Sequence, residues 1–160
     1  MRIFDGKAVV TTPSELEILI KRNFQAPPGV VFEAWTKAEH VMRWWDPSGI
    51  PLAVCEIDLR PGGTFRWING GAAGFTFAGI YFEITAPARL VFAVKTLPTK
   101  REPITTLDFI EDQGDTRLEM RIVFESVEDR DALLGMQVEA GIVQTLANLG
   151  EYLRGSNAID

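Results

Sequence analysis

The sequence predicts an α+β fold in which a bent antiparallel sheet of six to seven strands wraps around one long C-terminal helix, with two short helices after the first strand. Three observations support this prediction. Short segments in the middle of the chain carry apolar residues at every second position, as half-buried strands do. Short turns rich in glycine, proline and aspartate join them, and such turns connect antiparallel strands. Towards the C-terminus the apolar spacing changes to three and four residues, which is typical of a helix.

The first strand is predicted at residues 15–24, where ELEILIKRNF alternates and places Leu16, Ile18 and Ile20 on one side, with Arg22 as a further candidate for that side. Proline ends this strand at Pro27. Two short helices are expected in the following sequence, VVFEAWTKAEHVMRWW, because its large apolar residues fall on helical faces. Those faces consist of Val31, Ala34 and Trp35 in the first helix and of Val41, Trp44 and Trp45 in the second.

The middle of the chain contains four to six further strands, each bounded by turn residues. The alternation is clearest in TRLEMRIVFE, where Leu118, Met120 and Ile122 alternate with charged residues. One face of this strand is therefore expected to be buried and the other exposed to solvent. A helix that crosses such a curled sheet touches it along part of its length, which leaves a candidate cavity between the two. The segments are AVCEIDL, TFRWIN, FTFAGIYFEIT, RLVFAVKT, ITTLDFIE and TRLEMRIVFE.

The last element is predicted as one continuous helix from Glu128 to Arg154, about seven turns long. Ser126 or Asp129 is expected to cap its start, and Gly155 to end it. Its apolar residues form a single stripe, which therefore faces the sheet. That stripe consists of Leu134, Val138, Ile142, Leu146, Leu149 and Leu153.

The chain is long enough for one domain with a substantial core. Its 160 residues are 46% hydrophobic and 24% charged, which is typical of a globular protein. Folding at this length buries about 70% of the surface that the unfolded chain exposes. We expect the domain at residues 14–154, between an N-terminal extension at 1–13 and a C-terminal tail at 155–160.

Composition and charge argue against several classes of partner. With a net charge of −6 and a pI of about 4.9, the chain lacks the clustered lysine and arginine that nucleic-acid binding requires. We expect no membrane association, because the apolar runs fall short of the ~20 residues that span a bilayer. The N-terminus does not resemble a signal peptide, so a cytoplasmic location is expected.

No metal site or cofactor is expected. The chain has one cysteine, Cys55, and one histidine, His40, which together cannot supply the ligands of a zinc site. A single cysteine without a disulfide partner also fits a reducing compartment. Cys55 follows an apolar run and is interpreted as a small core residue, and His40 as a solvated or capping residue.

Several stretches together resemble a known superfamily. They are VFEAWTKAEHVMRWWDPSG, EIDLRPGGTFRW, GIYFEITAPARLVF and DTRLEMRIVF, followed by the closing helix. Over roughly residues 14–154 the chain is similar to the START-like (SRPBCC) superfamily, in the branch of homologues of the activator of the ninety-kDa heat shock protein ATPase. The Trp-Trp-x-Pro and Asp-Leu-Arg-Pro-Gly-Gly motifs are specific to that branch. The resemblance implies a helix-grip fold with a central ligand-binding cavity, and it does not imply a single activity.

The motif at residues 58–63 is interpreted as a turn, because proline fixes one dihedral angle and glycine tolerates a positive φ. Asp58 and Arg60 are expected to pair there, and a ligand role for Arg60 is the minority reading. The main interpretation of Trp35 and Trp44 is that they pack the two short helices onto the sheet.

The predicted cavity has an apolar and aromatic lining, which suits a hydrophobic or aromatic small molecule. The resemblance implies that Trp45 and Trp67 lie near its entrance. The candidate ligand-binding residues are Trp45, Trp67, Phe77, Tyr81, Phe92, Leu107, Phe109, Met120, Val138, Ile142 and Leu146, with Phe65 as an alternative to Trp67. The candidate polar cavity groups are Arg66, Glu83 and Gln144, and His40 and Tyr81 are further candidates for acid–base chemistry.

Three functions are compatible with these patterns. The first is a binding protein that holds an apolar small molecule, as a monomer or homodimer. The second is a cavity enzyme of cyclase, hydratase or hydrolase type, which needs convergent polar groups where the sequence offers scattered ones, so no catalytic residue is assigned. The third is a co-chaperone-like stimulator of a chaperone ATPase, with a chaperone as its partner; a family name alone does not transfer function.

Overall fold

The computed structural model describes residues 8–70 and 76–159, and its strands form one eight-stranded antiparallel sheet with the order β1-β2-β8-β7-β6-β5-β4-β3. Most neighbours in this order are also neighbours in the sequence, as the short turns predict. The exception is β2, which pairs with β8. The strands are β1 (Val9–Thr11), β2 (Glu17–Phe24), β3 (Val54–Ile57), β4 (Thr64–Ile68), β5 (Thr76–Thr85), β6 (Arg89–Val94), β7 (Ile104–Asp112) and β8 (Asp115–Val123).

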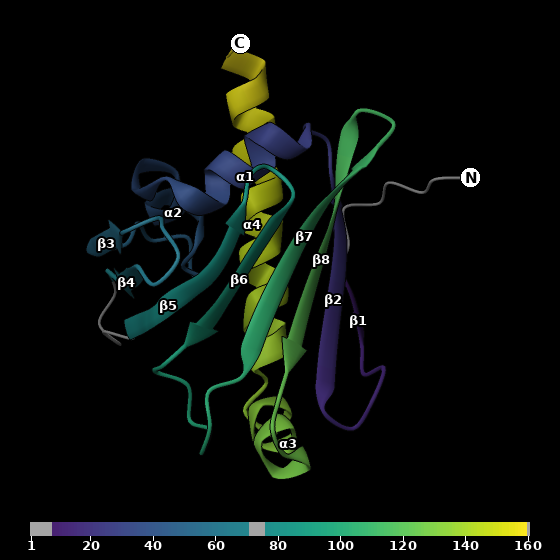
Figure 1. Ribbon diagram of the computed structural model, residues 1–160. Helices are drawn as coiled ribbons and strands as arrows, with labels where there is room; N and C mark the ends of the chain where they lie inside the picture. The colour runs from purple at the N-terminus through teal and green to yellow at the C-terminus, as the bar shows by residue number, and fades with distance from the viewer. Residues whose placement is uncertain (1–7, 71–75, 160) are drawn as a thin grey trace.

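The sheet curves around a long C-terminal helix, which confirms the predicted α+β helix-grip arrangement (Figure 1). Helix α4 crosses one face of the sheet, and the two short helices α1 and α2 lie at one end of it. A bulge in β5, between Tyr81 and Glu83, adds to the bend of the sheet. The helices are α1 (Pro28–Thr36), α2 (Ala38–Trp44), α3 (Val127–Gly135) and α4 (Val138–Ile159).

The structure has one strand more than the sequence predicted. The additional strand, β1, falls in the segment expected as an N-terminal extension, and its Val10 pairs with Ile20 of β2. Three residues are too few to show an alternating pattern, which is why this strand could not be predicted. Residues 1–7 of the expected extension and residue 160 of the expected tail lie outside the described residues.

The prediction of a single continuous C-terminal helix is wrong. The helix is interrupted after Gly135, and Gln137 adopts a positive φ of 57°, which ends α3 before α4 begins. Ser126 caps α3 as expected, because its side chain accepts a hydrogen bond from the backbone N–H of Asp129. The second helix continues past Gly155 to Ile159, beyond the end that the sequence predicted.

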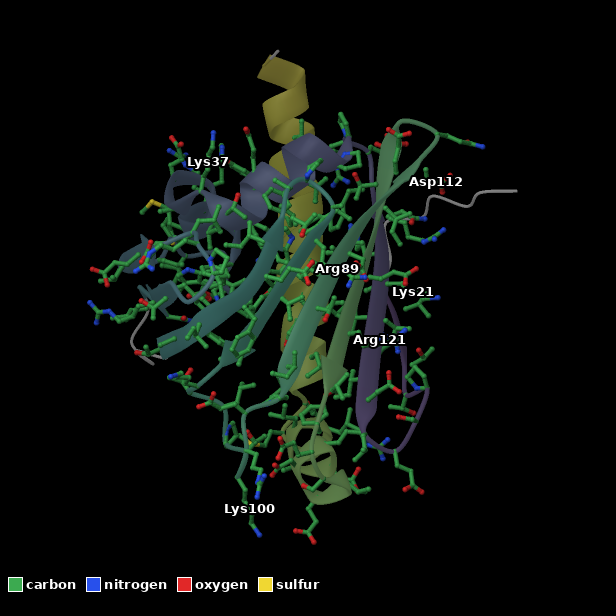
Figure 2. All side chains as sticks on the ribbon, in the orientation of Figure 1. Lys21, Lys37, Arg89, Lys100, Asp112 and Arg121 are labelled. Carbon is green, nitrogen blue, oxygen red and sulfur yellow. The ribbon has the colours of Figure 1, made fainter. Side chains whose placement is uncertain are left out.

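The two faces of the sheet differ as the alternation predicts. Leu118, Met120 and Ile122 of β8 are buried beneath the helices. The opposite face carries ion pairs between neighbouring strands, among them Arg89 with Asp108 and Arg121 with Glu17 (Figure 2). The helices therefore cover one face of the sheet only.

The motif at residues 58–63 builds the turn between β3 and β4, as predicted. The Arg60 guanidinium pairs with the Asp58 carboxylate at 2.9 Å, and Gly62 has a φ of 83°. A Cβ atom on Gly63 would overlap the carbonyl oxygen of Asp58, so only glycine fits there. The turn is tied to β5, because the N–H of Gly62 donates to the carbonyl of Tyr81 at 2.8 Å.

Candidate ligand-binding cavity

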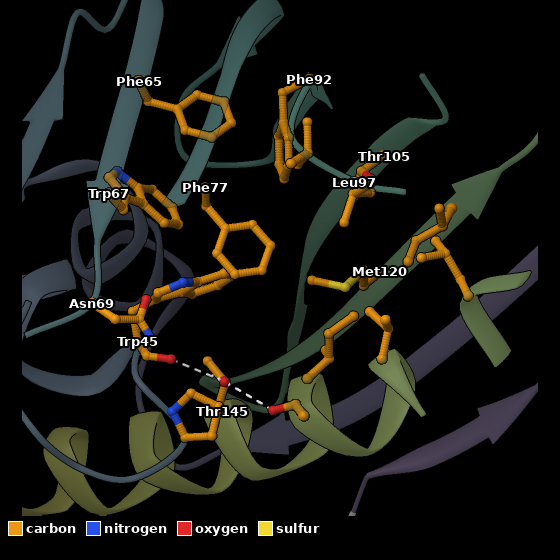
Figure 3. A pocket seen from close by; sticks show the side chains of 17 residues that line it. Trp45, Phe65, Trp67, Asn69, Phe77, Phe92, Leu97, Thr105, Met120 and Thr145 are labelled. Atoms are coloured by element: carbon orange, nitrogen blue, oxygen red, sulfur yellow. Dashed lines mark hydrogen bonds between the residues drawn. The ribbon is translucent and has the colours of Figure 1, made fainter. Parts of the chain in front are cut away.

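A cavity of about 340 Å³ lies between the inner face of the sheet and the helices (Figure 3). The sheet supplies one wall, and the start of α4 with the end of α3 supplies the other. The lining consists of Trp45, Pro47, Phe65, Trp67, Asn69, Phe77, Phe92, Val94, Leu97, Thr105, Met120, Ile122, Leu133, Val138, Gly141, Ile142 and Thr145.

The cavity has a buried floor and a partly exposed rim. Buried residues of the floor come from β4, β6, β7 and β8, and include Phe65, Phe92 and Met120. Pro47 on the rim is exposed, while Trp45 and Ile142 are half-buried. The cavity therefore reaches the surface between the loop after α2 and the start of α4.

Strand β4 places a row of side chains on the inner wall. Phe65 and Trp67 lie two residues apart and so point to the same face, and Asn69 continues that row just beyond the strand. The Phe65 and Trp67 ring centroids are 5.1 Å apart, and the Phe65 ring also lies 5.6 Å from that of Phe92. These aromatic contacts pack the side chains of the wall against one another.

Trp45 is fixed at the rim by hydrogen bonds from α4. The Thr145 hydroxyl donates to the backbone carbonyl of Trp45 at 3.0 Å, and the Asn148 amide donates to the carbonyl of Asp46 at 2.9 Å. The Trp45 ring meets Trp67 edge-on with a centroid distance of 4.7 Å, and Phe77 with one of 5.2 Å. Helix α4 therefore positions a side chain that comes from a distant part of the sequence.

The loop between β6 and β7 carries Leu97 to the cavity and is held by a buried carboxylate. Asp129 of α3 is 4% exposed and accepts hydrogen bonds from the backbone N–H groups of Lys100 and Arg101, at 3.0 and 3.2 Å. Leu133, one turn further along α3, lines the cavity. Asp129 therefore ties together two segments that each contribute a wall residue.

Most of the apolar residues that the sequence proposed do line the cavity: Trp45, Trp67, Phe77, Phe92, Met120, Val138 and Ile142, together with the alternative Phe65. Four others are buried elsewhere in the core. Tyr81 packs against Phe65, with ring centroids 5.1 Å apart, and Phe109 packs against Phe32 at 5.3 Å. Leu107 and Leu146 are fully buried between the sheet and the helices, outside the lining.

The structure does not place the proposed polar groups in the cavity. Arg66 pairs with Glu56 at 2.9 Å on the outer face of the sheet, since it alternates with the inward-facing Phe65 and Trp67. Glu83 is exposed on β5 next to the bulge. Gln144 is exposed on α4, where its amide donates to Asn148 at 3.1 Å.

His40 is neither solvated nor a helix cap. It is half-buried on α2, and its Nδ1 forms a hydrogen bond of 2.5 Å with the Tyr152 hydroxyl of α4. This contact joins the two helices and lies outside the cavity lining.

Several lining residues were missed by the sequence reasoning: Pro47, Asn69, Val94, Leu97, Thr105, Ile122, Leu133, Gly141 and Thr145. Five of them could have been predicted from their spacing. Val94 lies two residues from Phe92, Thr105 two from Leu107 and Ile122 two from Met120, and Gly141 and Thr145 lie on the same helical face as Val138 and Ile142. Pro47, Asn69 and Leu97 lie outside helices and strands, where no periodicity indicates direction.

No ionisable side chain belongs to the lining among the residues that the structure describes. In the sheet, Cys55 pairs with the lining residue Trp67 and Tyr81 pairs with the lining residue Phe92, and burial raises the pKa of the Cys55 thiol to about 11. Burial also raises the pKa of the Tyr81 hydroxyl, with a further contribution from Cys55. Both groups are therefore neutral at physiological pH.

Within residues 8–70 and 76–159 no cluster of three or more histidine, cysteine, aspartate or glutamate residues could hold a metal ion. Among the described helices, none combines the length and the apolar character that a membrane span requires.

Comparisons with known proteins agree with this fold. A family model described as activator of Hsp90 ATPase homolog 1-like protein matches residues 25–154. A comparison with curated proteins gives no match.

Among solved structures, a protein of Rhodobacter sphaeroides is 23% identical with a TM-score of 0.82, and the match covers 93% of this chain and 99% of that one. A protein of Nitrosomonas europaea is 25% identical with a TM-score of 0.79, over 92% and 99% of the two chains. A protein of Mycobacterium smegmatis is 23% identical with a TM-score of 0.76, over 91% and 97%.

Proposed function

We propose that this chain, which belongs to the family of activator of Hsp90 ATPase homolog 1-like proteins, binds an apolar or aromatic small molecule between its sheet and helix α4. The observation that carries the proposal is the unfilled space of about 340 Å³. Protein interiors are normally packed without voids larger than a water molecule. Ligand pockets start at about 300 Å³ and are mostly apolar, which is the size and character found here.

Gly141, a lining residue of the same cavity, adds to this support. It lies inside α4, where glycine costs about 1 kcal/mol relative to alanine. A Cβ atom at this position would meet nothing within 4 Å, so packing does not require glycine there. Because Gly141 lines the cavity, a larger side chain would project into the space. We interpret the glycine as a cost to the helix that keeps the cavity open.

The same geometry argues against the enzyme alternative. Acid–base or nucleophilic catalysis needs at least two polar groups that converge on the substrate. In the part of the chain that the structure describes, the polar groups of the lining are the side chains of Asn69, Thr105 and Thr145 and the indole N–H groups of Trp45 and Trp67, and none of them is an acid, a base or a nucleophile at neutral pH. Binding without turnover is therefore the function that the cavity supports best.

The family description favours a second candidate, stimulation of an Hsp90 ATPase. This role would use an outer surface, so it is compatible with an occupied cavity. It is tested by adding the full chain to purified Hsp90 and measuring ATP hydrolysis. Stimulation that is unaffected by the cavity variant described next would separate this role from ligand binding.

The binding proposal is tested by titrating the full chain with N-phenyl-1-naphthylamine, a neutral apolar probe whose fluorescence rises in apolar surroundings. We expect saturable binding with one site per chain. The variant Gly141→Leu adds a side chain at the lining, and we expect it to bind the probe at least about tenfold more weakly, because the leucine and the probe then compete for the same space. Its unfolding free energy should not fall, since leucine is a better helix former than glycine.

The matched control is Gly155→Leu, the same substitution in the same helix. Gly155 is exposed and has open space around it, so this variant adds an equal side chain outside the cavity. It should bind the probe like the unmodified chain. Equal binding by Gly141→Leu and Gly155→Leu would show that the probe does not occupy the cavity.

A further inference from the structure

We infer that the ligand is an uncharged molecule with an aromatic body and one neutral hydrogen-bonding group, such as a hydroxyl, which binds the side-chain hydroxyl of Thr105 on the cavity floor. This inference rests on the proposed binding function and deepens it. It follows from three features of the described lining: aromatic rings, no charge, and one buried hydroxyl that is open to the cavity.

Thr105 points into the cavity from the middle of the sheet. It lies on β7, where it pairs with Phe92 of β6 on one side and with Ile122 of β8 on the other. Directly paired residues of neighbouring strands share a face, and all three of these residues line the cavity (Figure 3). Because Thr105 is 6% exposed, its side chain is surrounded by the cavity and its walls rather than by bulk solvent.

The Thr105 hydroxyl has no hydrogen-bond partner among the described residues. Two other polar atoms of the lining also lack a partner, the Oδ1 of Asn69 and the Nε1 of Trp67, but the surrounding atoms seal both of them off. The Oγ1 of Thr105 is not sealed in this way, so a molecule in the cavity can reach it. A hydroxyl in apolar surroundings is stabilised when it forms a hydrogen bond, and a polar group of a ligand can supply that bond.

The other polar groups of the lining are less suited to orient a ligand. The Thr145 hydroxyl already donates to the carbonyls of Trp45 and Gly141, at 3.0 and 2.9 Å. Trp45 and Asn69 are half-buried, so both residues keep contact with solvent. Ligand pockets fix the orientation of an apolar molecule through a few well-placed polar groups, and Thr105 is the buried group that is free to do so here.

The absence of charge on the described lining predicts that ionic ligands are rejected. A carboxylate or ammonium group taken out of water needs a counter-charge, and none of the described lining residues supplies one. The rings of Trp45, Trp67 and Phe77 favour a flat aromatic body, since aromatic groups pack edge to face against one another.

The inference is tested by calorimetric titration of the unmodified full chain and of Thr105→Val with 2-naphthol and with 2-methylnaphthalene. The two molecules have nearly the same shape, and the substitution removes a hydroxyl while keeping the shape of the side chain. We expect the unmodified chain to bind 2-naphthol about tenfold more tightly than 2-methylnaphthalene, because one hydrogen bond changes an affinity by about that factor. Thr105→Val should abolish this preference and leave the binding of the hydrocarbon unchanged.

The matched control is Thr106→Val, the same substitution at the next residue of β7. Thr106 pairs with Arg121, whose side chain lies on the outer face of the sheet, so this variant removes a hydroxyl outside the cavity. It should keep the preference for 2-naphthol. A third ligand, the anion 2-naphthoate, should not bind the unmodified chain measurably at neutral pH.

Equal binding of 2-naphthol and 2-methylnaphthalene by the unmodified chain would overturn this inference and leave the proposed function standing. A preference that survives Thr105→Val, one that Thr106→Val also removes, or tight binding of 2-naphthoate would overturn it as well. If neither neutral molecule binds, the inference is wrong, and if N-phenyl-1-naphthylamine does not bind either, the proposed function fails with it.

A crystal structure of the unmodified chain with 2-naphthol gives a second measurement that does not depend on the folding of any variant. We expect the hydroxyl oxygen of the ligand at about 2.8 Å from the Oγ1 of Thr105. A naphthol oxygen that lies elsewhere in the cavity would contradict the inference.

Discussion

Cys55 illustrates at the scale of one residue how burial changes chemistry. Its side chain is half-buried on β3, opposite Trp67 of β4, and burial raises the pKa of its thiol from 9.0 to about 11. Because the neutral thiol is favoured in the folded protein, its contribution to stability is complete below the ordinary pKa. That contribution is lost as the pH rises through the range from about 9 to about 11.

We predict that Cys55 reacts slowly with iodoacetamide in the folded protein. At pH 8 its thiolate fraction should be about a hundredfold lower than that of an ordinary cysteine, since each pH unit is a factor of about ten. The rate should keep rising until the pH approaches about 11. The measurement is the rate of modification against pH, with the unfolded chain in urea as the control. A rate that levels off near pH 9 would contradict the account.

A second prediction concerns the turn at residues 58–63. We expect Gly63→Ala to lower the unfolding free energy by about 2–3 kcal/mol, because its Cβ would overlap the carbonyl of Asp58. Gly62→Ala should cost about 1 kcal/mol, since only its positive φ of 83° is unfavourable for alanine. Both values are measured by urea denaturation. A smaller loss for Gly63→Ala than for Gly62→Ala would show that the turn is not packed as described.

At the scale of elements, the sequence predicted the helices and strands whose apolar residues recur periodically, and it did not predict the break between two helices. The alternation in β8 and the two short helices around Trp35 and Trp44 were confirmed, because their burial follows the spacing of the residues. The interruption between α3 and α4 was not foreseen. Gln137 adopts its positive φ without being glycine or proline, and the glycine at the end of α3, Gly135, lies inside an apolar stripe that continues from Leu134 to Val138.

The first helix after β8 offers a test at this scale. We predict that Asp129→Ala lowers the unfolding free energy by about 2–4 kcal/mol, because it leaves two backbone N–H groups of the β6–β7 loop without their acceptor. The control Asp131→Ala removes an exposed carboxylate from the same helix and should cost about 0.5 kcal/mol or less. Urea denaturation of both variants gives the comparison. Similar losses for the two would mean that Asp129 does not hold the loop.

At the scale of the whole molecule, the account depends on incomplete filling of the space between the two layers. The sequence could predict that α4 lies on a curled sheet, and it could name many wall residues by parity. It could not predict whether those side chains meet, because that depends on the separation of the layers and on loops that carry Pro47, Asn69 and Leu97. The polar candidates Arg66 and Glu83 were placed wrongly for a different reason: Arg66 alternates with Phe65 and Trp67 and so faces outward, and Glu83 follows the bulge in β5.

The most direct test of the central claim is a crystal structure of the full chain grown with N-phenyl-1-naphthylamine. We predict electron density for the probe between the wall formed by Trp67 and Phe92 and the helix residues Gly141 and Ile142, with the backbone unchanged. An interior in which these side chains touch and leave no room for the probe would contradict the claim. So would a probe bound on the outer face of the sheet.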